Sequence, residues 1–171
     1  MRSKLNLMAC LFSANLIIGA IGCATNNHHK NKDKMSTAEQ TGIFPKGNPQ
    51  PPEYFTGPAF LYPLLSRDKN NDFVLGSVTF EPGARTLWHT HPKGQVLIVI
   101  EGEGIYQEKG KPARHLKKGD VLNIPENVEH WHGATDHSKF VHIAITSYKG
   151  DQNVVWLQPV SKAEYEAANK Q

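Results

Sequence analysis

Three histidines and one glutamine recur at spacings that suit a metal site. His89 and His91 are separated by one residue, Gln95 follows shortly after them, and His130 lies in a second segment. Because successive side chains of a strand point to opposite faces, His89 and His91 share a face, and a later strand can bring His130 opposite them. Three neutral imidazoles and an amide oxygen that converge inside a barrel would bind a divalent metal. A His-x-His pair by itself would instead favour partly buried structural histidines.

The spacing around these residues resembles the two sequence motifs of the cupin family. The first motif, residues 83–102, keeps every spacing of the family pattern and has Gln95 where most cupins have Glu. The second, residues 119–134, contains His130 and has Asn127 in place of a usual Gly and Ala134 in place of a usual Asn. Asn is the next best residue for a left-handed turn, so we expect the hairpin to form. The resemblance implies an all-β, single-domain cupin, a jelly-roll barrel or double-stranded β-helix.

Short β-rich segments separated by turn residues predict an antiparallel sandwich or barrel. The tail is the one helical candidate, because Ser161 and Glu164 form a capping box ahead of residues 165–169. No internal repeat is visible, so we expect one barrel. The predicted strands are 59–65, 73–80, 86–91, 95–100, 104–107, 113–116, 120–124, 128–132, 139–147 and 154–159.

Alternation along these strands predicts which side chains face the interior. If the first two histidines point inward, alternate residues of the next strand do so too and leave an aliphatic outer face. Small residues at Gly76 and Ala144 would leave open volume near the metal, so we expect a pocket. The outer face implies a covering sheet or a partner subunit, so we expect a homodimer or homotetramer. The predicted inward residues are Gln95, Leu97, Val99, His130, His132, Phe140, His142, Ala144 and Thr146, and the outward ones are Val96, Ile98, Ile100, Trp131, Val141, Ile143 and Ile145.

Residues 1–23 are expected to be a signal peptide. Arg2 and Lys4 precede a mostly apolar run, and the order Ala20-Ile21-Gly22-Cys23 resembles a bacterial lipobox, in which Cys23 is lipidated. A transmembrane anchor is the alternative, but the run is near the short limit for a span. We therefore expect an exported protein, either periplasmic or anchored to the membrane through Cys23. Cleavage without lipidation stays open.

The rest of the chain divides into a flexible tether and N-terminal arm at residues 24–53, a barrel at 54–160 and a helical tail at 161–171. Within the barrel, Tyr54 and Phe55 are expected to pack against it or against a neighbouring subunit. The formal net charge of the chain is +3. The leader and tether carry a larger positive net charge than this total, so the barrel is close to neutral. A neutral barrel gives no electrostatic case for binding nucleic acid. Because both cysteines lie in the leader, the barrel has no thiol nucleophile and no disulfide.

His132 and His142 are the candidates for proton transfer. Imidazole titrates near neutral pH, and both side chains are expected to reach the open face of the metal. The alternative for each is a supporting role, in which it orients a metal ligand through a hydrogen bond.

A narrower resemblance suggests a reaction. Segments 54–57, 81–85, 88–95, 130–135 and 142–144 are similar to small bacterial cupins that include manganese-dependent hydroxynitrile lyases. The resemblance implies that the metal binds a cyanohydrin oxygen while a histidine removes its proton, which releases cyanide and an aldehyde. In that group the metal ligands correspond to His89, His91, Gln95 and His130, and the histidines that match His132 and His142 line the active site.

The metal and the reaction have alternatives. The resemblance favours Mn, whereas imidazole ligands also suit Fe, Ni, Zn and Cu. Gln95 in place of Glu leaves the cation more electrophilic, which favours Lewis-acid chemistry. The alternatives are an oxygen-dependent cupin dioxygenase, which needs a redox-active metal, and a metal-dependent protein that binds a small acid or sugar without turnover.

Overall fold

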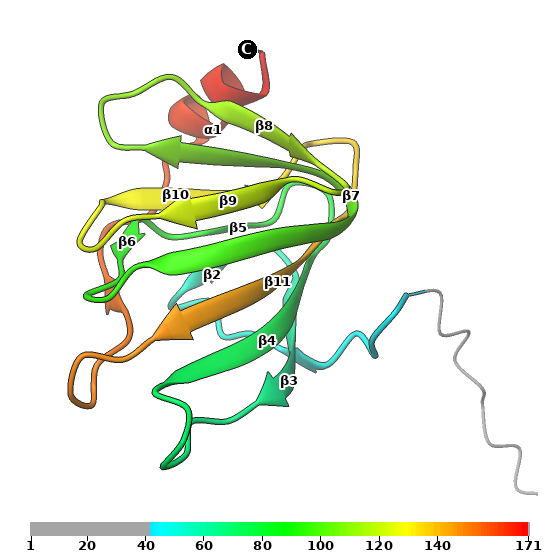
Figure 1. Ribbon diagram of the computed structural model, residues 1–171. Helices are drawn as coiled ribbons and strands as arrows, with labels where there is room; N and C mark the ends of the chain where they lie inside the picture. Colours follow the sequence, from blue (N-terminus) through cyan, green and yellow to red (C-terminus); the bar gives the residue numbers. More distant parts are fainter. Residues whose placement is uncertain (1–41, 171) are drawn as a thin grey trace, which may run out of the picture. The chain divides into compact units, whose positions relative to one another are not determined.

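The computed structural model describes residues 42–170 (Figure 1). The predicted signal peptide, Cys23 and the tether up to residue 41 lie outside these residues and stay predictions. Within the described part of the chain, no helix is long and apolar enough to cross a membrane.

Twelve strands and one helix form in the described residues. In chain order they are β1 (Asn48–Pro49), β2 (Phe55–Thr56), β3 (Ala59–Leu65), β4 (Phe73–Phe80), β5 (Arg85–Thr86), β6 (His89–Thr90), β7 (Gln95–Glu108), β8 (Arg114–Lys117), β9 (Val121–Ile124), β10 (His130–Ala134), β11 (Phe140–Ser147), β12 (Val155–Trp156) and α1 (Lys162–Asn169). This is the all-β architecture with a short C-terminal helix that the sequence predicts.

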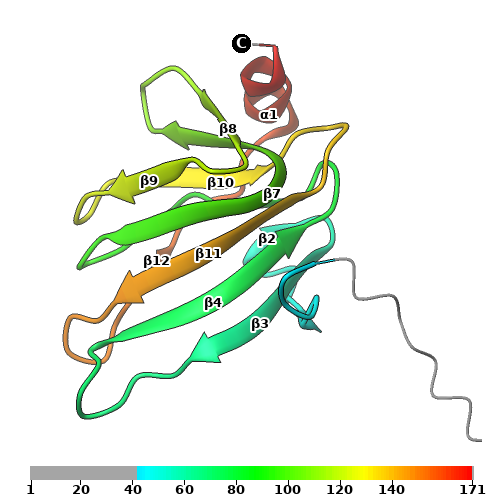
Figure 2. The same ribbon diagram turned by 45° about the vertical axis from the view of Figure 1, so that its right-hand side comes forward.

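The strands form one curled antiparallel sheet in the order β1-β3-β4-β11-β7-β10-β5-β2. Of the remaining strands, β8 and β9 pair with β7, and β6 lies between β10 and β12. Figures 1 and 2 show β4, β11 and β7 side by side along one wall. The first part of β7 pairs with β11 and β9, and its last part pairs with β10 and β8, so β7 joins the two halves of the sheet.

The strand boundaries differ from the prediction in two places. Two predicted strands form a single strand in the structure, and one predicted strand is divided into two. The predicted segments 95–100 and 104–107 are continuous in β7, because Gly102 adopts a φ of +72° and lets the chain turn from one half of the sheet to the other without ending the ladder. The predicted strand 86–91 is divided between β5 and β6. Between β5 and β6, the backbone amide of Leu87 donates to the Tyr54 carbonyl and that of Trp88 to the Gln158 carbonyl. Neither acceptor belongs to a strand, so the strand pairing is interrupted here.

The predicted alternation is confirmed along the first part of β7, whereas burial does not alternate along β11, where Phe140, Val141 and His142 are all buried. Gln95, Leu97 and Val99 are buried and the residues between them are half-buried, and His142 lies opposite Val99 in the register. The register shifts between Val141 and His142, where a bulge leaves Ile100 of β7 without a partner on β11. Trp131 is turned away from the barrel interior, as predicted, and belongs to a second core cluster with Tyr165 of α1.

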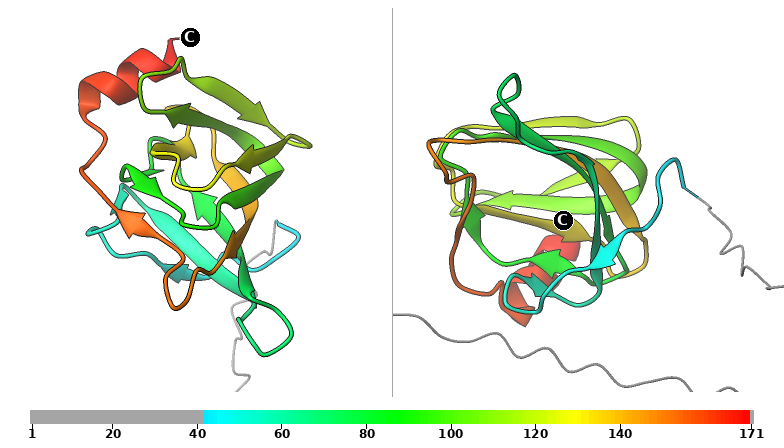
Figure 3. Two further views of the ribbon diagram at one scale, coloured as in Figure 1. Left: turned by 60° about the vertical axis from the view of Figure 1, so that its left-hand side comes forward. Right: turned by 90° about the horizontal axis from the view of Figure 1, so that it is seen from below.

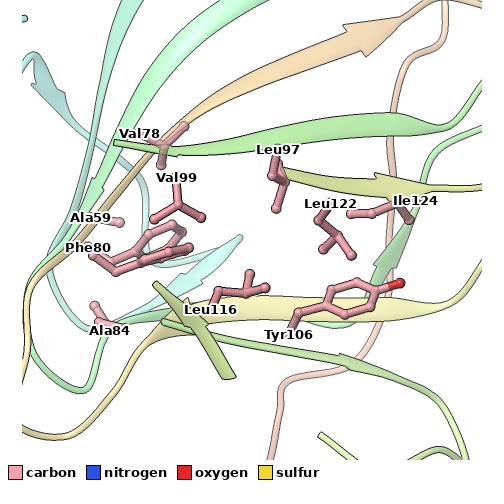
Figure 4. Close-up of a cluster of buried hydrophobic side chains, with 12 residues drawn as sticks. Ala59, Val78, Phe80, Ala84, Leu97, Val99, Tyr106, Leu116, Leu122 and Ile124 are labelled. Carbon is pink, nitrogen blue, oxygen red and sulfur yellow. The ribbon is translucent and has the colours of Figure 1, made fainter. Parts of the chain in front are cut away.

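Two hydrophobic clusters stabilise this arrangement. The larger fills the barrel interior, and Figure 4 shows Val78, Leu97 and Val99 facing Leu116 and Tyr106 across it. The smaller holds α1 against the strands, as the position of the helix in Figure 3 shows. The Tyr165 hydroxyl donates to the Ala134 carbonyl at 2.9 Å. The helix begins with the predicted capping box, which is present in both directions.

Candidate metal centre

Neighbouring strands bring the predicted ligands together inside the barrel. His89 of β6 and His130 of β10 are direct partners in the register, and their ring centroids are 4.1 Å apart. His91 follows in the turn between β6 and β7, with its ring 5.0 Å from His89 and 5.5 Å from His130. Gln95 begins β7. All four side chains are buried.

Each of the three histidines has one ring nitrogen fixed by a backbone carbonyl. The Nδ1 atoms of His89, His91 and His130 lie 2.9, 2.6 and 2.8 Å from the carbonyl oxygens of Leu87, Asn153 and Val128. A carbonyl only accepts, so Nδ1 carries the proton and Nε2 presents a lone pair. A metal-binding histidine is typically held in this way. The buried Nε2 atoms of His91 and His130 have no hydrogen-bond partner within the described residues.

The side chain of Gln95 is also held by one hydrogen bond and leaves a second polar atom available. Its amide nitrogen donates to the Thr146 hydroxyl at 2.9 Å, and its buried Oε1 has no hydrogen-bond partner among the residues described. The Gln95 side chain is also close enough to His91 to influence the pKa of that imidazole. Buried polar atoms without partners are rare in folded proteins. The Nε2 atoms of His91 and His130 and the Oε1 atom of Gln95 are in this state, and with the imidazole of His89 they match the donor set of a divalent-metal site.

His132 and His142 lie beside this group. Their rings are 5.0 Å apart in a T-shaped arrangement, and His132 is 5.4 Å from His89. Phe80 packs against both imidazoles, with centroid distances of 5.8 Å to each. The Nδ1 atom of His132 and both ring nitrogens of His142 are buried without a well-aligned hydrogen bond in the described structure. The backbone of Ile143 lies close enough to His142 to oppose the lowering of its pKa.

Among the described residues, the group of mutually close metal-ligating atoms contains His132 and does not contain His91. One ring nitrogen from each of His89, His130 and His132 lies within 4.8 Å of the other two. The structure therefore brings together all six residues that the sequence singled out. What separates them is how their rings are fixed, since His89, His91 and His130 are held by backbone carbonyls and His132 and His142 are not.

Burial keeps these imidazoles neutral. It lowers the pKa of His130 and of His142 to about 4, and the pKa of His91 is also lowered. The pKa values of His89 and His132 are held well below 6.5 by burial and by the neighbouring histidines, which disfavour a second positive charge. Neutral imidazoles are the form that binds metal.

A pocket of about 450 Å³ leads to this group. His89, His91, Gln95, His132 and His142 line it, whereas His130 does not and lies behind the others. Gly76 and Ala144 line it too, as the sequence predicted. Most of the remaining wall is apolar or aromatic, and no charged side chain contributes to it in the described residues. The pocket is therefore suited to a small neutral molecule.

Three contributors to the site were not identified as such from the sequence. Trp156 of β12 packs against His89 at 4.9 Å and against Tyr54 at 4.9 Å. Asn153 supplies a backbone carbonyl, so its side chain leaves no signal in the sequence. Thr146 was expected on the inward face, but its hydrogen bond to Gln95 depends on the register between β11 and β7. Tyr54 and Phe55 pack against the barrel itself, through Trp156 and Phe80.

The chain resembles characterised proteins in both sequence and structure. The family described as a cupin domain matches residues 76–146. An (R)-mandelonitrile lyase from Granulicella tundricola is 39% identical over 115 residues, which cover 67% of this chain and 88% of that protein. An acireductone dioxygenase from Bacillus cytotoxicus is 34% identical over 61 residues, and the chain spans only 36% of its length.

Solved structures are also similar to this chain. The crystal structure of a cupin-like protein from Thermotoga maritima superimposes with a TM-score of 0.71 at 46% identity, over 75% of this chain and 98% of that one. A DMSP lyase from Ruegeria pomeroyi gives a TM-score of 0.52 at 20% identity, over 64% of this chain and 54% of that one. The second likeness shows the fold alone.

Proposed function

Because the chain belongs to the cupin family, we propose that it is a metal-dependent lyase that cleaves a small neutral hydroxynitrile into an aldehyde and hydrogen cyanide. One observation carries the proposal. Within the described residues, buried donor atoms of His91, Gln95 and His130 have no hydrogen-bond partner, His91 and Gln95 line an uncharged pocket, and two further buried histidines stand beside them. The similarity to a mandelonitrile lyase over most of that protein's length supports the choice of reaction.

His89, His91, Gln95 and His130 would hold the metal, for which we propose Mn. A divalent cation bound to these residues supplies Lewis acidity toward an oxygen of the ligand. The amide of Gln95 adds no negative charge to the site, so it does not weaken that acidity as a carboxylate would.

His142 is proposed as the base. Its neutral ring takes the proton of the hydroxynitrile hydroxyl, the oxygen electrons form the carbonyl, and the bond to the nitrile carbon breaks with its electron pair on cyanide. The same imidazolium then returns its proton to cyanide, so the residue is regenerated. Because burial lowers the pKa of His142 to about 4, its protonated form is a strong enough acid for this return. His132 lies between His142 and His89 and helps to pass the proton.

The pocket walls determine what can react. An apolar, uncharged wall favours a neutral ligand and excludes charged ones, which would lose their hydration without a compensating partner. Phe80 packs against both catalytic histidines and keeps water from their ring nitrogens. Cyanide loss then competes with fewer side reactions.

Metal analysis of the purified protein, followed by a mandelonitrile cleavage assay, tests the proposal. We expect cleavage to appear when Mn is added to metal-free protein and to be lost in His142→Ala. The surface variant Lys162→Ala serves as control, because among the described residues the side chain of Lys162 pairs with Glu166 alone, on the same helix α1. Failure to release benzaldehyde from fully loaded protein would contradict the lyase.

A dioxygenase is the second candidate, favoured by the local match to acireductone dioxygenases. It would consume oxygen in the presence of a redox-active metal, which an oxygen electrode detects. Gln95 argues against it, because the carboxylate ligand that some cupin dioxygenases use is missing here. Loaded protein that shows neither activity would support a binding protein.

A further inference from the structure

His91 depends on a loop for its orientation. It lies in the turn between β6 and β7, where no strand ladder fixes the side chain. The loop that connects β11 to β12 passes beside it, and the Asn153 carbonyl of this loop accepts the Nδ1 proton of His91 at 2.6 Å. His89 and His130 differ in this respect, because each bonds to the carbonyl two residues before it in its own segment.

Arg67 contacts that loop from a neighbouring connection. It lies in the connection between β3 and β4, and its Nη1 donates to the Gly150 carbonyl at 2.8 Å and contacts Asp151 at 3.3 Å. Its Nη2 pairs with Asp72 at 2.8 Å, and its guanidinium lies over the Tyr148 ring at 4.5 Å. One side chain therefore joins the β3–β4 connection to three residues of the β11–β12 loop.

The remaining bonds of the loop are few. Within the described residues, its backbone is tied to the β3–β4 connection by the Tyr148 amide, which donates to the Asp72 carbonyl, and to itself by the bridge between Lys149 and Gln152. An exposed ion pair contributes little by itself. A planar guanidinium that is satisfied by two carboxylates, a carbonyl and an aromatic ring is fixed in both position and direction.

The same two segments border the pocket. Leu65 and Ser66 line it from the end of β3, and Asn153 and Val154 line it from the loop. The contacts of Arg67 thus set the distance between two edges of the pocket as well as the position of the Asn153 carbonyl.

We propose that Arg67 is a positioning residue for the metal centre, which acts through the loop 148–153 and the Asn153 carbonyl to orient the His91 imidazole. This rests on the proposed role of His91 as a ligand but not on the lyase reaction. Loss of Arg67 frees the loop, weakens the hydrogen bond to Nδ1 of His91, and leaves His89 and His130 as they are.

Metal binding provides the first test. The dissociation constant of Zn²⁺ is measured by competition with a chelator in the wild-type protein and in Arg67→Ala, Arg67→Lys and Lys162→Ala. Loss of a residue that orients a metal ligand typically weakens binding about 10-fold to 100-fold. We expect the affinity for Zn²⁺ to fall about tenfold in Arg67→Ala. The loss should be smaller in Arg67→Lys, which keeps the positive charge but not the planar guanidinium, and absent in Lys162→Ala.

Nuclear magnetic resonance of the metal-free protein provides the second test. The Nδ1 proton of His91 should exchange with water faster in Arg67→Ala, while that of His130, held by the Val128 carbonyl, should not change. Unchanged metal affinity with an unchanged His91 signal would overturn the inference. Equal acceleration at both histidines would do so too, since it would show general loosening. Neither measurement depends on turnover, so a failed cleavage assay would reject the lyase and leave this inference standing.

Discussion

At the scale of single residues, the hydrogen bonds on Nδ1 assign different roles to similar histidines. His89, His91 and His130 each have Nδ1 fixed by a carbonyl, which leaves the lone pair on Nε2. His132 and His142 have no such bond in the described structure and can bind or release a proton without losing one. This difference supports three ligands and two proton carriers rather than five equivalent ligands.

Removal of a ligand histidine should prevent metal loading. We expect His89→Ala and His130→Ala to lose the bound metal, because each leaves the site with one imidazole fewer and a cavity in place of the ring. Elemental analysis of the purified variants measures this directly. Full occupancy in either variant would show that the assigned residue is not a ligand.

Replacement of His142 should leave metal binding intact and abolish turnover, unlike replacement of a ligand. His142→Ala is expected to retain the metal and to lose hydroxynitrile cleavage by about two to four orders of magnitude, the usual contribution of a general base. Metal content and turnover are measured on the same sample. Unchanged turnover would exclude His142 as the base, and loss of the metal would place it among the ligands.

At the scale of elements, β7 organises the site. Its first residue is Gln95, its middle turns at Gly102, and its last part pairs with β10, which carries His130 and His132. A side chain at Gly102 would bring its Cβ to 1.7 Å from the Lys139 carbonyl oxygen. The bend of β7 thus requires glycine, both for its positive φ and for the close approach of β11.

Gly102→Ala should therefore be strongly destabilising. Gly110 gives a matched control, because its φ is also positive, at +76°, while nothing lies within 4 Å of the place that an added methyl group would occupy. We expect Gly110→Ala to lower the free energy of unfolding by about 1–2 kcal/mol for the left-handed backbone alone. Gly102→Ala should cost about 3–5 kcal/mol, since the clash adds to it. Urea denaturation measures both, and equal losses would contradict the role of the close approach.

The sequence predicted much of this arrangement, for reasons that differ between residues. Alternation placed Gln95 and His142 inward because a strand has a period of two and the aliphatic residues mark the opposite face. It predicted the left-handed turn at Asn127, whose φ is 60°. The Asn153 carbonyl could not be predicted, since any residue offers one. The continuity of β7 could not be predicted either, because Gly102 is as compatible with a turn that ends a strand as with a bend inside one.

At the scale of the whole molecule, the outer face of the sheet is aliphatic. Val96, Ile98 and Ile100 of β7 are half-buried and point away from the barrel, next to Ile143 and Ile145 of β11. We propose that a second copy of the chain covers this face. Ile98→Asp should then shift the protein from dimer to monomer in light scattering, because a charge would be buried in the interface. Lys162→Asp is the control, because Lys162 is exposed on α1 and does not belong to these strands, and a wild-type monomer would reject the proposal.

Acid should destabilise the metal-free protein through its buried histidines. The pKa of His142 is about 4 in the folded state because burial disfavours its charged form, against 6.5 when it is exposed. Above pH 6.5 the ring is neutral in both states, so its contribution to the free energy of unfolding is constant. As the pH falls from 6.5 toward 4, the unfolded chain binds a proton that the folded one does not, and stability decreases.

His142→Phe isolates this contribution. Phe80 and Phe140 pack against the ring, so an aromatic replacement suits the site. Between pH 7 and pH 4 the wild-type free energy of unfolding should fall by about 3 kcal/mol more than that of the variant, since each pKa unit corresponds to about 1.4 kcal/mol. Urea titrations of both metal-free proteins across this range measure the difference. Parallel pH profiles would mean that His142 takes up its proton in the folded state as readily as in the unfolded one, which would contradict its burial as a neutral ring.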